Sequence, residues 1–303
     1  MRTPSPHSFM RAWPLLAAIA LLGACASRPP ATSPVVATSP PDTPVQVWVT
    51  TSDHRLALSP DTTRLEQADG QPVDIEVDAG QHYQRMLGFG AAITDSSAWL
   101  IQQRLDPEQR TALLQELFGR DGDGIGLDFT RLTIGASDFS RRHYSLDDPA
   151  DGKPDPELRH FSIAPNLEDV VPVTRQALAI NPQLKVMASP WSAPAWMKDS
   201  GSLIKGSLRE EYFDAFARYL VRYVDAYAGQ GIPIFALTLQ NEPSFEPGDY
   251  PGMRLGADQR ARLIGRHLGP MLAARGMATQ IFDWDHNWDK PYEPVAVLSD
   301  AER

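Results

Sequence analysis

The sequence has 303 residues, of which 42% are hydrophobic and 22% charged, so it is long enough for one large domain or two small ones with a sizeable core. Its 38 acidic residues outnumber 28 basic ones, and the resulting net charge of −10 argues against nucleic acid and anionic membrane surfaces as partners. A single cysteine excludes an internal disulfide, and no Cys/His cluster has the spacing of a zinc site.

Residues 1–25 have the pattern of a secretory signal peptide. Arg2 and Arg11 supply positive charge, and the apolar run at 13–22 is too short to span a bilayer. The run ends in Leu-Gly-Ala-Cys, which resembles the lipobox of bacterial lipoproteins. We therefore expect Cys25 to be lipidated and the chain to be an exported cell-envelope lipoprotein, anchored by its lipid and not spanning the membrane. The alternative is an ordinary signal peptide in which this cysteine is incidental.

The next two segments differ in composition. Residues 26–44 are mostly Pro, Ala, Thr, Ser and Val, and with almost no large side chains this segment is expected to be a disordered tether. Between 45 and 80, apolar and polar residues alternate with a period of two at 45–50 and again at 73–77. This alternation predicts a few half-buried strands of a small β-element.

From residue 81 to 303 the pattern changes to strands that alternate with amphipathic helices, which is typical of a parallel α/β architecture. Five strand–helix units can be counted, and Pro270 is a candidate for a kink or break in the last long helix. The expected strands are 86–94, 129–134, 184–189, 233–243 and 280–283, and the expected helices are 96–103, 107–118, 167–179, 210–228 and 257–274.

The fourth expected strand ends abruptly in Gln-Asn-Glu-Pro at 240–243. Pro243 has no backbone donor and biases Glu242 away from helical dihedral angles, so the strand should stop there and deliver Glu242 to the rim of the sheet. We predict that Glu242 is a general acid/base. A glutamate before a proline at a strand end is more often an ordinary surface carboxylate, so this prediction depends on the motifs around it.

Polar and aromatic residues also follow other strands, at 137–140, 189–196 and 284–288. In a (β/α)₈ barrel the carboxyl ends of the strands meet at one face, where active sites lie. Tryptophans and carboxylates gathered there suit a carbohydrate, since aromatic faces stack on sugar rings and polar side chains bind hydroxyls. Two alternatives remain open: Trp191 as a core aromatic residue and Asp138 as a turn cap.

Four motifs in this order resemble glycoside hydrolase family 30, and its glucosylceramidase-type β-glucosidases in particular. They are Gly-Phe-Gly-Ala-Ala-Ile-Thr-Asp at 88–95, Arg-Leu-Thr-Ile-Gly-Ala-Ser-Asp-Phe-Ser at 131–140, Ala-Ser-Pro-Trp-Ser-Ala-Pro-Ala-Trp-Met-Lys at 188–198 and Gln-Asn-Glu-Pro at 240–243. The resemblance covers about residues 81–290 and implies a (β/α)₈ TIM barrel, with about five of its eight units present here. It further implies a β-sandwich built from both chain ends, of which 45–80 form an incomplete part, and no cofactor or metal.

The resemblance also implies roles for single residues. Glu242 corresponds to the acid/base and Asn241 to the partner of the sugar 2-hydroxyl. Asp138 and Trp191 correspond to residues that hold the glucose ring, and Arg131 to an arginine beside the catalytic carboxylates. The acidic and histidine residues at 283–289 fit no metal-ligand spacing, so no metal is expected.

A retaining glycosidase needs two carboxylates about 5–5.5 Å apart, one of them a nucleophile. The family resemblance places that nucleophile on the seventh strand, and a barrel of about 250 residues beginning near residue 83 extends to about residue 330 or beyond. We therefore expect a C-terminally truncated chain whose nucleophile lies past residue 303 and whose fifth strand is an open edge. Such a chain should fold poorly alone and lack glucosidase activity.

Three functions remain open at this point. The first is a retaining β-glycosidase for glucosylceramide-type β-glucosides, and the second is a family 30 endo-β-1,6-glucanase or xylanase. The third is an inactive surface lipoprotein that binds glycans. Arg131 with Asp138-Phe139-Ser140 forms a glucosylceramidase-like signature, but it does not identify the aglycone. The partner in each case is a β-linked glucoside or glycan.

Overall fold

The computed structural model describes residues 44–64, 75, 77, 78 and 80–299. By its contacts the chain forms two units, residues 1–82 and 83–303. The predicted signal peptide with Cys25, the tether and most of the expected strand at 73–77 lie outside the described residues, so these predictions stay predictions. No helix of the described part is long and apolar enough to cross a membrane.

In the first unit, strand β1 (Pro44–Val49) pairs with β2 (Ser59–Arg64) in an antiparallel ladder. The predicted alternation is confirmed in β1, because Val45, Val47 and Val49 are half-buried while Gln46 and Trp48 are exposed. The second strand, β2, was not predicted, since its sequence Ser-Pro-Asp-Thr-Thr-Arg has almost no apolar residue to mark it.

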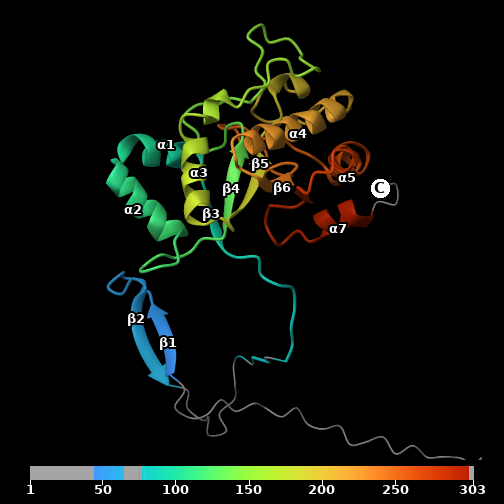
Figure 1. Cartoon of the computed structure of the whole chain (residues 1–303). Coiled ribbons are helices and arrows are strands. Elements are labelled where there is room, and N and C mark those ends of the chain that lie inside the picture. Colours follow the sequence, from blue (N-terminus) through green and yellow to red (C-terminus); the bar gives the residue numbers. More distant parts are fainter. Residues whose placement is uncertain (1–43, 65–74, 76, 79, 300–303) are drawn as a thin grey trace, which may run out of the picture. The chain divides into compact units, whose positions relative to one another are not determined.

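The second unit contains a sheet of five parallel strands in the order β3-β4-β5-β6-β7, with helices between successive strands (Figure 1). Neighbours in the sheet are also neighbours in the chain, as in a (β/α)₈ barrel, which confirms the predicted architecture. The strands are β3 (Gly90–Ala92), β4 (Phe129–Ile134), β5 (Lys185–Pro190), β6 (Ile234–Thr238) and β7 (Gln280–Phe282).

The helices begin and end where local sequence signals place them. Thr94 caps α1 and Asp106 caps α2, each by a reciprocal capping box, and Pro107 occupies the first turn of α2. The α-helices are α1 (Asp95–Arg104), α2 (Pro107–Phe118), α3 (Val170–Ile180), α4 (Phe213–Gly229), α5 (Ala257–Arg262), α6 (Gly269–Ala274) and α7 (Tyr292–Ser299). Single-turn 3₁₀ helices span Ala164–Asn166, Ala195–Met197 and Glu210–Tyr212.

Helix α4 shows how the core is built and how it reaches the strand ends. Tyr219, Tyr223 and Tyr227 recur every four residues, so they lie on one face, and all three are fully buried. The hydroxyl of Tyr219 accepts a hydrogen bond from the backbone N–H of Leu146 at 3.1 Å. This bond ties the helix layer to the loop that follows β4.

Two expected strand boundaries are corrected by the structure, and the bounds of one expected helix are confirmed with a change of form inside it. The first strand shrinks to β3, because Gly88 takes a positive φ of 137° and interrupts the extended chain before it, while Thr94 already caps α1 after it. The fourth strand, β6, ends at Thr238 and not at Glu242, so a turn carries the predicted acid/base. The expected helix at 257–274 contains a π-helical segment, Leu263–Leu268, which ends two residues before Pro270. Pro270 lacks an N–H and cannot follow a regular α-turn without a clash, and the widened turn accommodates it.

Candidate active site

Glu242 lies in a turn just beyond the carboxyl end of β6, and the two neighbouring strands hold that turn. The backbone N–H of Asn241 donates to the carbonyl of Pro190, the last residue of β5, at 2.7 Å. The backbone N–H of Glu242 donates to Asp285 Oδ1 at 2.9 Å. Glu242 has a φ of +47°, a left-handed conformation that costs a non-glycine residue about 1–2 kcal/mol. The contacts from both sides hold this conformation, and they leave the carboxylate about one-third exposed.

Asp285, which follows β7, accepts hydrogen bonds from residues of three other strands. Besides the Glu242 amide, it accepts from Arg131 Nη2 at 2.6 Å and from the hydroxyls of Ser189 and Thr238 at 3.1 Å each. These donors come from β4, β5, β6 and the turn after β6. Both carboxylate oxygens of Asp285 therefore accept hydrogen bonds, and these bonds hold the Glu242 turn against the neighbouring strands.

Arg131 connects the predicted binding residues to one another. Its Nη2 donates to Asn241 Oδ1 at 2.8 Å, and its guanidinium lies 4.5 Å from the centre of the Trp191 ring. Because the amide oxygen of Asn241 faces a donor-only guanidinium, its NH₂ group is left to donate elsewhere, for example to the oxygen of a sugar hydroxyl.

Trp191 is 8% exposed, with Arg131 against its ring. The structure thus brings Arg131, Trp191, Asn241 and Glu242 together, and places Trp191 inside the strand-end cluster and not on an open rim. Its role as a sugar-binding residue stays a prediction.

Asp138 lies on the loop after β4 with its side chain exposed. The turn is closed by Ser137 and Ser140, whose hydroxyls accept the backbone N–H groups of Phe139 and Ser137, so the alternative of Asp138 as the cap is not needed. Burial raises the pKa of Tyr250, and the charges of Asp138 and Glu242 raise it further. Sequence reasoning missed Tyr250.

A hollow of about 410 Å³ lies beside Glu242, at the end of β7. His286 belongs to both places, because it lines the hollow and its Nε2 lies 3.5 Å from Glu242 Oε1. Trp288 on the same wall is 98% exposed and offers a free aromatic face. The lining residues are Asp283, Trp284, His286, Asn287, Trp288, Lys290, Pro291 and Pro294. The sequence analysis had singled out the polar and aromatic residues at 284–288, which form part of this lining.

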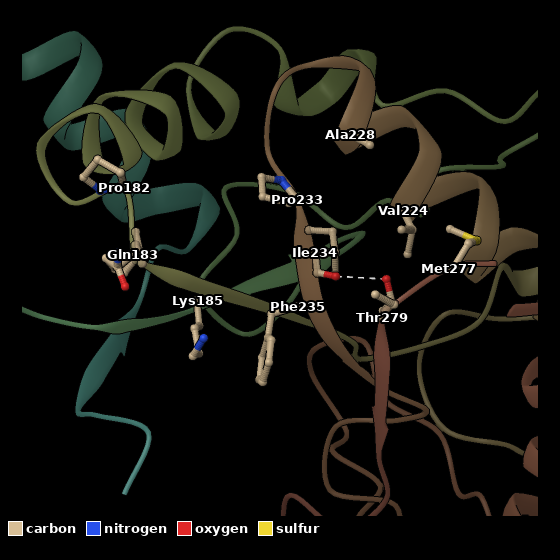
Figure 2. A pocket seen from close by; sticks show the side chains of 12 residues that line it. Pro182, Gln183, Lys185, Val224, Ala228, Pro233, Ile234, Phe235, Met277 and Thr279 are labelled. Atoms are coloured by element: carbon tan, nitrogen blue, oxygen red, sulfur yellow. Dashed lines mark hydrogen bonds between the residues drawn. The ribbon is translucent and has the colours of Figure 1, made fainter. Parts of the chain in front are cut away.

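A second hollow, of about 590 Å³, lies at the opposite ends of the strands and is shown in Figure 2. Lys185 begins β5, Ile234 begins β6, and the hydroxyl of Thr279, just before β7, donates to the Ile234 carbonyl at 2.9 Å. Its lining is mostly apolar, with Lys185 as the one charged residue, so it offers no carboxylate for acid/base chemistry. The amino ends of barrel strands serve stability, and catalysis belongs to the carboxyl ends.

Within the described part of the chain, no group of three or more His, Cys, Asp or Glu side chains is arranged to hold a metal ion. Asp283 is committed to an ion pair with the buried Arg260, at 2.8 Å, and Asp285 is occupied as described.

Comparison with known proteins decides the family. Residues 86–302 match the model of the glycosyl hydrolase family 30 TIM-barrel domain. The chain belongs to glycoside hydrolase family 30. The predicted family and the TIM-barrel fold class are thereby confirmed, and the five parallel strands are part of that barrel.

The matching relatives include proteins named as endo-1,6-β-glucanases and proteins named as glucosylceramidases. The chain is 37% identical to an endo-1,6-β-D-glucanase of Neurospora crassa, over 72% of this chain and 46% of that protein. It is 34% identical to the mouse lysosomal acid glucosylceramidase, over 73% of this chain and 44% of that protein. Among solved structures, an endo-β1,6-glucanase matches with a TM-score of 0.72 and 31% identity, covering 85% of this chain and 57% of its own. The chain thus spans about half the length of the curated relatives it matches.

Proposed function

We propose that this chain carries the acid/base side of a retaining β-glycosidase active site, with Glu242 as the acid/base. The observation that carries the proposal is the strained turn after β6, which Pro190 and Asp285 hold so that a part-exposed carboxylate stands at the carboxyl end of the barrel sheet. Membership of glycoside hydrolase family 30 supports it.

The geometry suits the two proton transfers of such a reaction. In the first step Glu242 gives its proton to the glycosidic oxygen as the bond to the sugar breaks and a second carboxylate forms a glycosyl-enzyme. In the second step ionised Glu242 takes a proton from the water that attacks this intermediate. The free NH₂ group of Asn241 is available for the sugar 2-hydroxyl, whose contacts strengthen in the transition state.

For the substrate, we favour a β-1,6-linked glucan. Three relatives named as endo-1,6-β-glucanases are 34–37% identical to this chain. The aromatic hollow beside Glu242, with the exposed Trp288, suits a leaving group that is itself a sugar, because aromatic faces stack on sugar rings.

A glucosylceramide-type β-glucoside is the second candidate. It is supported by 34% identity to the mouse lysosomal acid glucosylceramidase and 32% to a Caenorhabditis elegans protein named putative glucosylceramidase 4. A glycan-binding protein without turnover is the third.

One experiment separates these candidates. The protein expressed from its complete reading frame is assayed on linear β-1,6-glucan, glucosylceramide and aryl β-glucosides, and proton NMR identifies the anomer released. We expect β-1,6-glucan to be cleaved fastest with retention of configuration, and Glu242→Gln to lower the rate on poor leaving groups by 10²-fold or more. Binding without turnover, or an unchanged rate for Glu242→Gln, would overturn the proposal. The 303-residue chain assayed in parallel tests the expected inactivity of that length.

We also infer that the protein is exported and anchored at the cell envelope through a lipid on Cys25, on the strength of the sequence pattern at 1–25. Cys25→Ser should release the protein from membrane fractions and abolish metabolic labelling with palmitate. Retention of the variant in the membrane would contradict the anchor.

A further inference from the structure

A line of polar side chains leads from Lys290 to the carboxylate of Glu242. Lys290 Nζ lies 3.3 Å from Ser244 Oγ, and Ser244 Oγ lies 3.4 Å from His286 Nδ1. The other ring nitrogen, His286 Nε2, lies 3.5 Å from Glu242 Oε1. The four residues come alternately from the segment after β7 and from the turn after β6, where the line ends at Glu242.

The direction of these hydrogen bonds follows from chemistry. An ammonium group only donates, so Ser244 Oγ accepts from Lys290. A serine hydroxyl has one hydrogen, which is then available to His286 Nδ1 as the acceptor. A neutral imidazole that accepts at Nδ1 carries its proton on Nε2, the ring nitrogen that lies 3.5 Å from Glu242 Oε1.

The imidazole ring is held in place by its surroundings. The His286 side chain is 10% exposed, and its ring centre lies 5.5 Å from that of Trp284 and 6.4 Å from that of Phe245. These rings limit the ring orientations open to His286. The other titratable or charged groups grouped around the Glu242 turn are Arg131, Asp138, Asp249, Tyr250, Asp285 and Lys290.

We propose that His286 is the positioning residue of the acid/base, with Nε2–H holding Glu242 Oε1 so that Oε2 faces the glycosidic oxygen. The transferable proton of Glu242 then resides on Oε2, passes to the leaving oxygen as the glycosidic bond breaks, and returns to Oε2 from the attacking water. This inference rests on the proposed function of Glu242 as acid/base.

The test compares three substitutions in the protein expressed from its complete reading frame. Glutamine places an N–H close to the position of Nε2, asparagine places one close to that of Nδ1, and leucine has none. We expect His286→Leu and His286→Asn to lower kcat/KM on an aryl β-glucoside with a poor leaving group by about tenfold, the effect of one lost hydrogen bond in the transition state. His286→Gln should stay within about threefold of the wild type.

Two readouts separate positioning from packing. With a good leaving group, which needs little protonation, the losses in the asparagine and leucine variants should shrink to about twofold. The alkaline limb of the pH–rate profile should move to higher pH in these two variants, because a donor that favours the ionised carboxylate has been removed. The control is His160→Gln, the same substitution at an exposed histidine outside the site, which should leave all of these values unchanged.

The outcomes are separable. Equal losses in the glutamine, asparagine and leucine variants, or no loss in any of them, would overturn the positioning role. If His286→Leu does not fold, the glutamine and asparagine pair alone decides. Glu242→Gln, run in parallel, tests the underlying proposal: full activity in this variant overturns the proposed function, whereas its loss with unchanged His286 variants overturns only the role of His286.

Discussion

We predict that buried Lys198 makes the free energy of unfolding of this protein increase as the pH rises above 7. Its side chain is fully buried, and its ammonium group donates to Ser192 Oγ at 2.8 Å, to the Leu203 carbonyl at 3.0 Å and to the Gly252 carbonyl at 2.9 Å. It thereby ties the loop after β5 to the loop after β6, which carries the proposed acid/base. Burial lowers the pKa of Lys198 from its ordinary 10.5 to about 7, although the nearby Asp199 and other charges oppose this.

The sign and size of the effect follow from proton binding. Above pH 7 the unfolded chain still protonates this lysine while the folded chain loses the proton, so the free energy of unfolding rises with pH until about 10.5. The slope approaches about 1.4 kcal/mol per pH unit, and between pH 7 and 9 the gain is about 2 kcal/mol.

The assay is urea unfolding at pH 7, 8 and 9 for the wild type, Lys198→Met and Lys153→Met. Lys198→Met removes this titrating group, so the variant should not gain stability with pH. The difference between the free energies of unfolding of wild type and variant should therefore be about 2 kcal/mol larger at pH 9 than at pH 7. Lys153, whose side chain is 79% exposed, is the matched control, and its variant should follow the wild type at every pH. Parallel curves for the wild type and Lys198→Met would refute the reasoning.

Three further substitutions test the packing around the site. Asp285→Ala should lower the free energy of unfolding by about 2–4 kcal/mol in urea titrations, since it leaves a largely buried guanidinium without its carboxylate; the exposed Asp289→Ala should stay within about 0.5 kcal/mol. Trp196→Phe removes the indole N–H that donates to buried Asp147. Burial raises the pKa of Asp147 to about 6. The cost of this substitution should be about 2–3 kcal/mol at pH 7.5 and smaller at pH 5, where Asp147 is protonated; an equal cost at both values would contradict this. Gly90→Ala would press a methyl group onto a backbone carbonyl of β4, and should destabilise by more than about 3 kcal/mol or prevent folding.

Local signals predicted most of the elements of the barrel unit. The expected helix 107–118 and strand 129–134 coincide with α2 and β4, because Asp106 and Pro107 mark the start of the helix and aromatic and β-branched residues mark the strand. The short helix α7 was missed, since its eight residues give too brief a pattern to be recognised. Pro270 was recognised from the sequence as a candidate kink or break in this helix, but the π-helical form of the turn before it was not predicted.

The sequence alone determined the family, the order of strands and helices, and the candidate acid/base, because these depend on local patterns and on motifs of contiguous residues. The tertiary structure decided how Glu242 is held. Asp285 follows Glu242 by 43 residues and Arg131 precedes it by 111, and only the parallel pairing of β4, β5, β6 and β7 brings them to one edge. The sequence shows His286 as one polar residue among several after β7; its contact with Glu242 exists only because adjacent parallel strands end side by side.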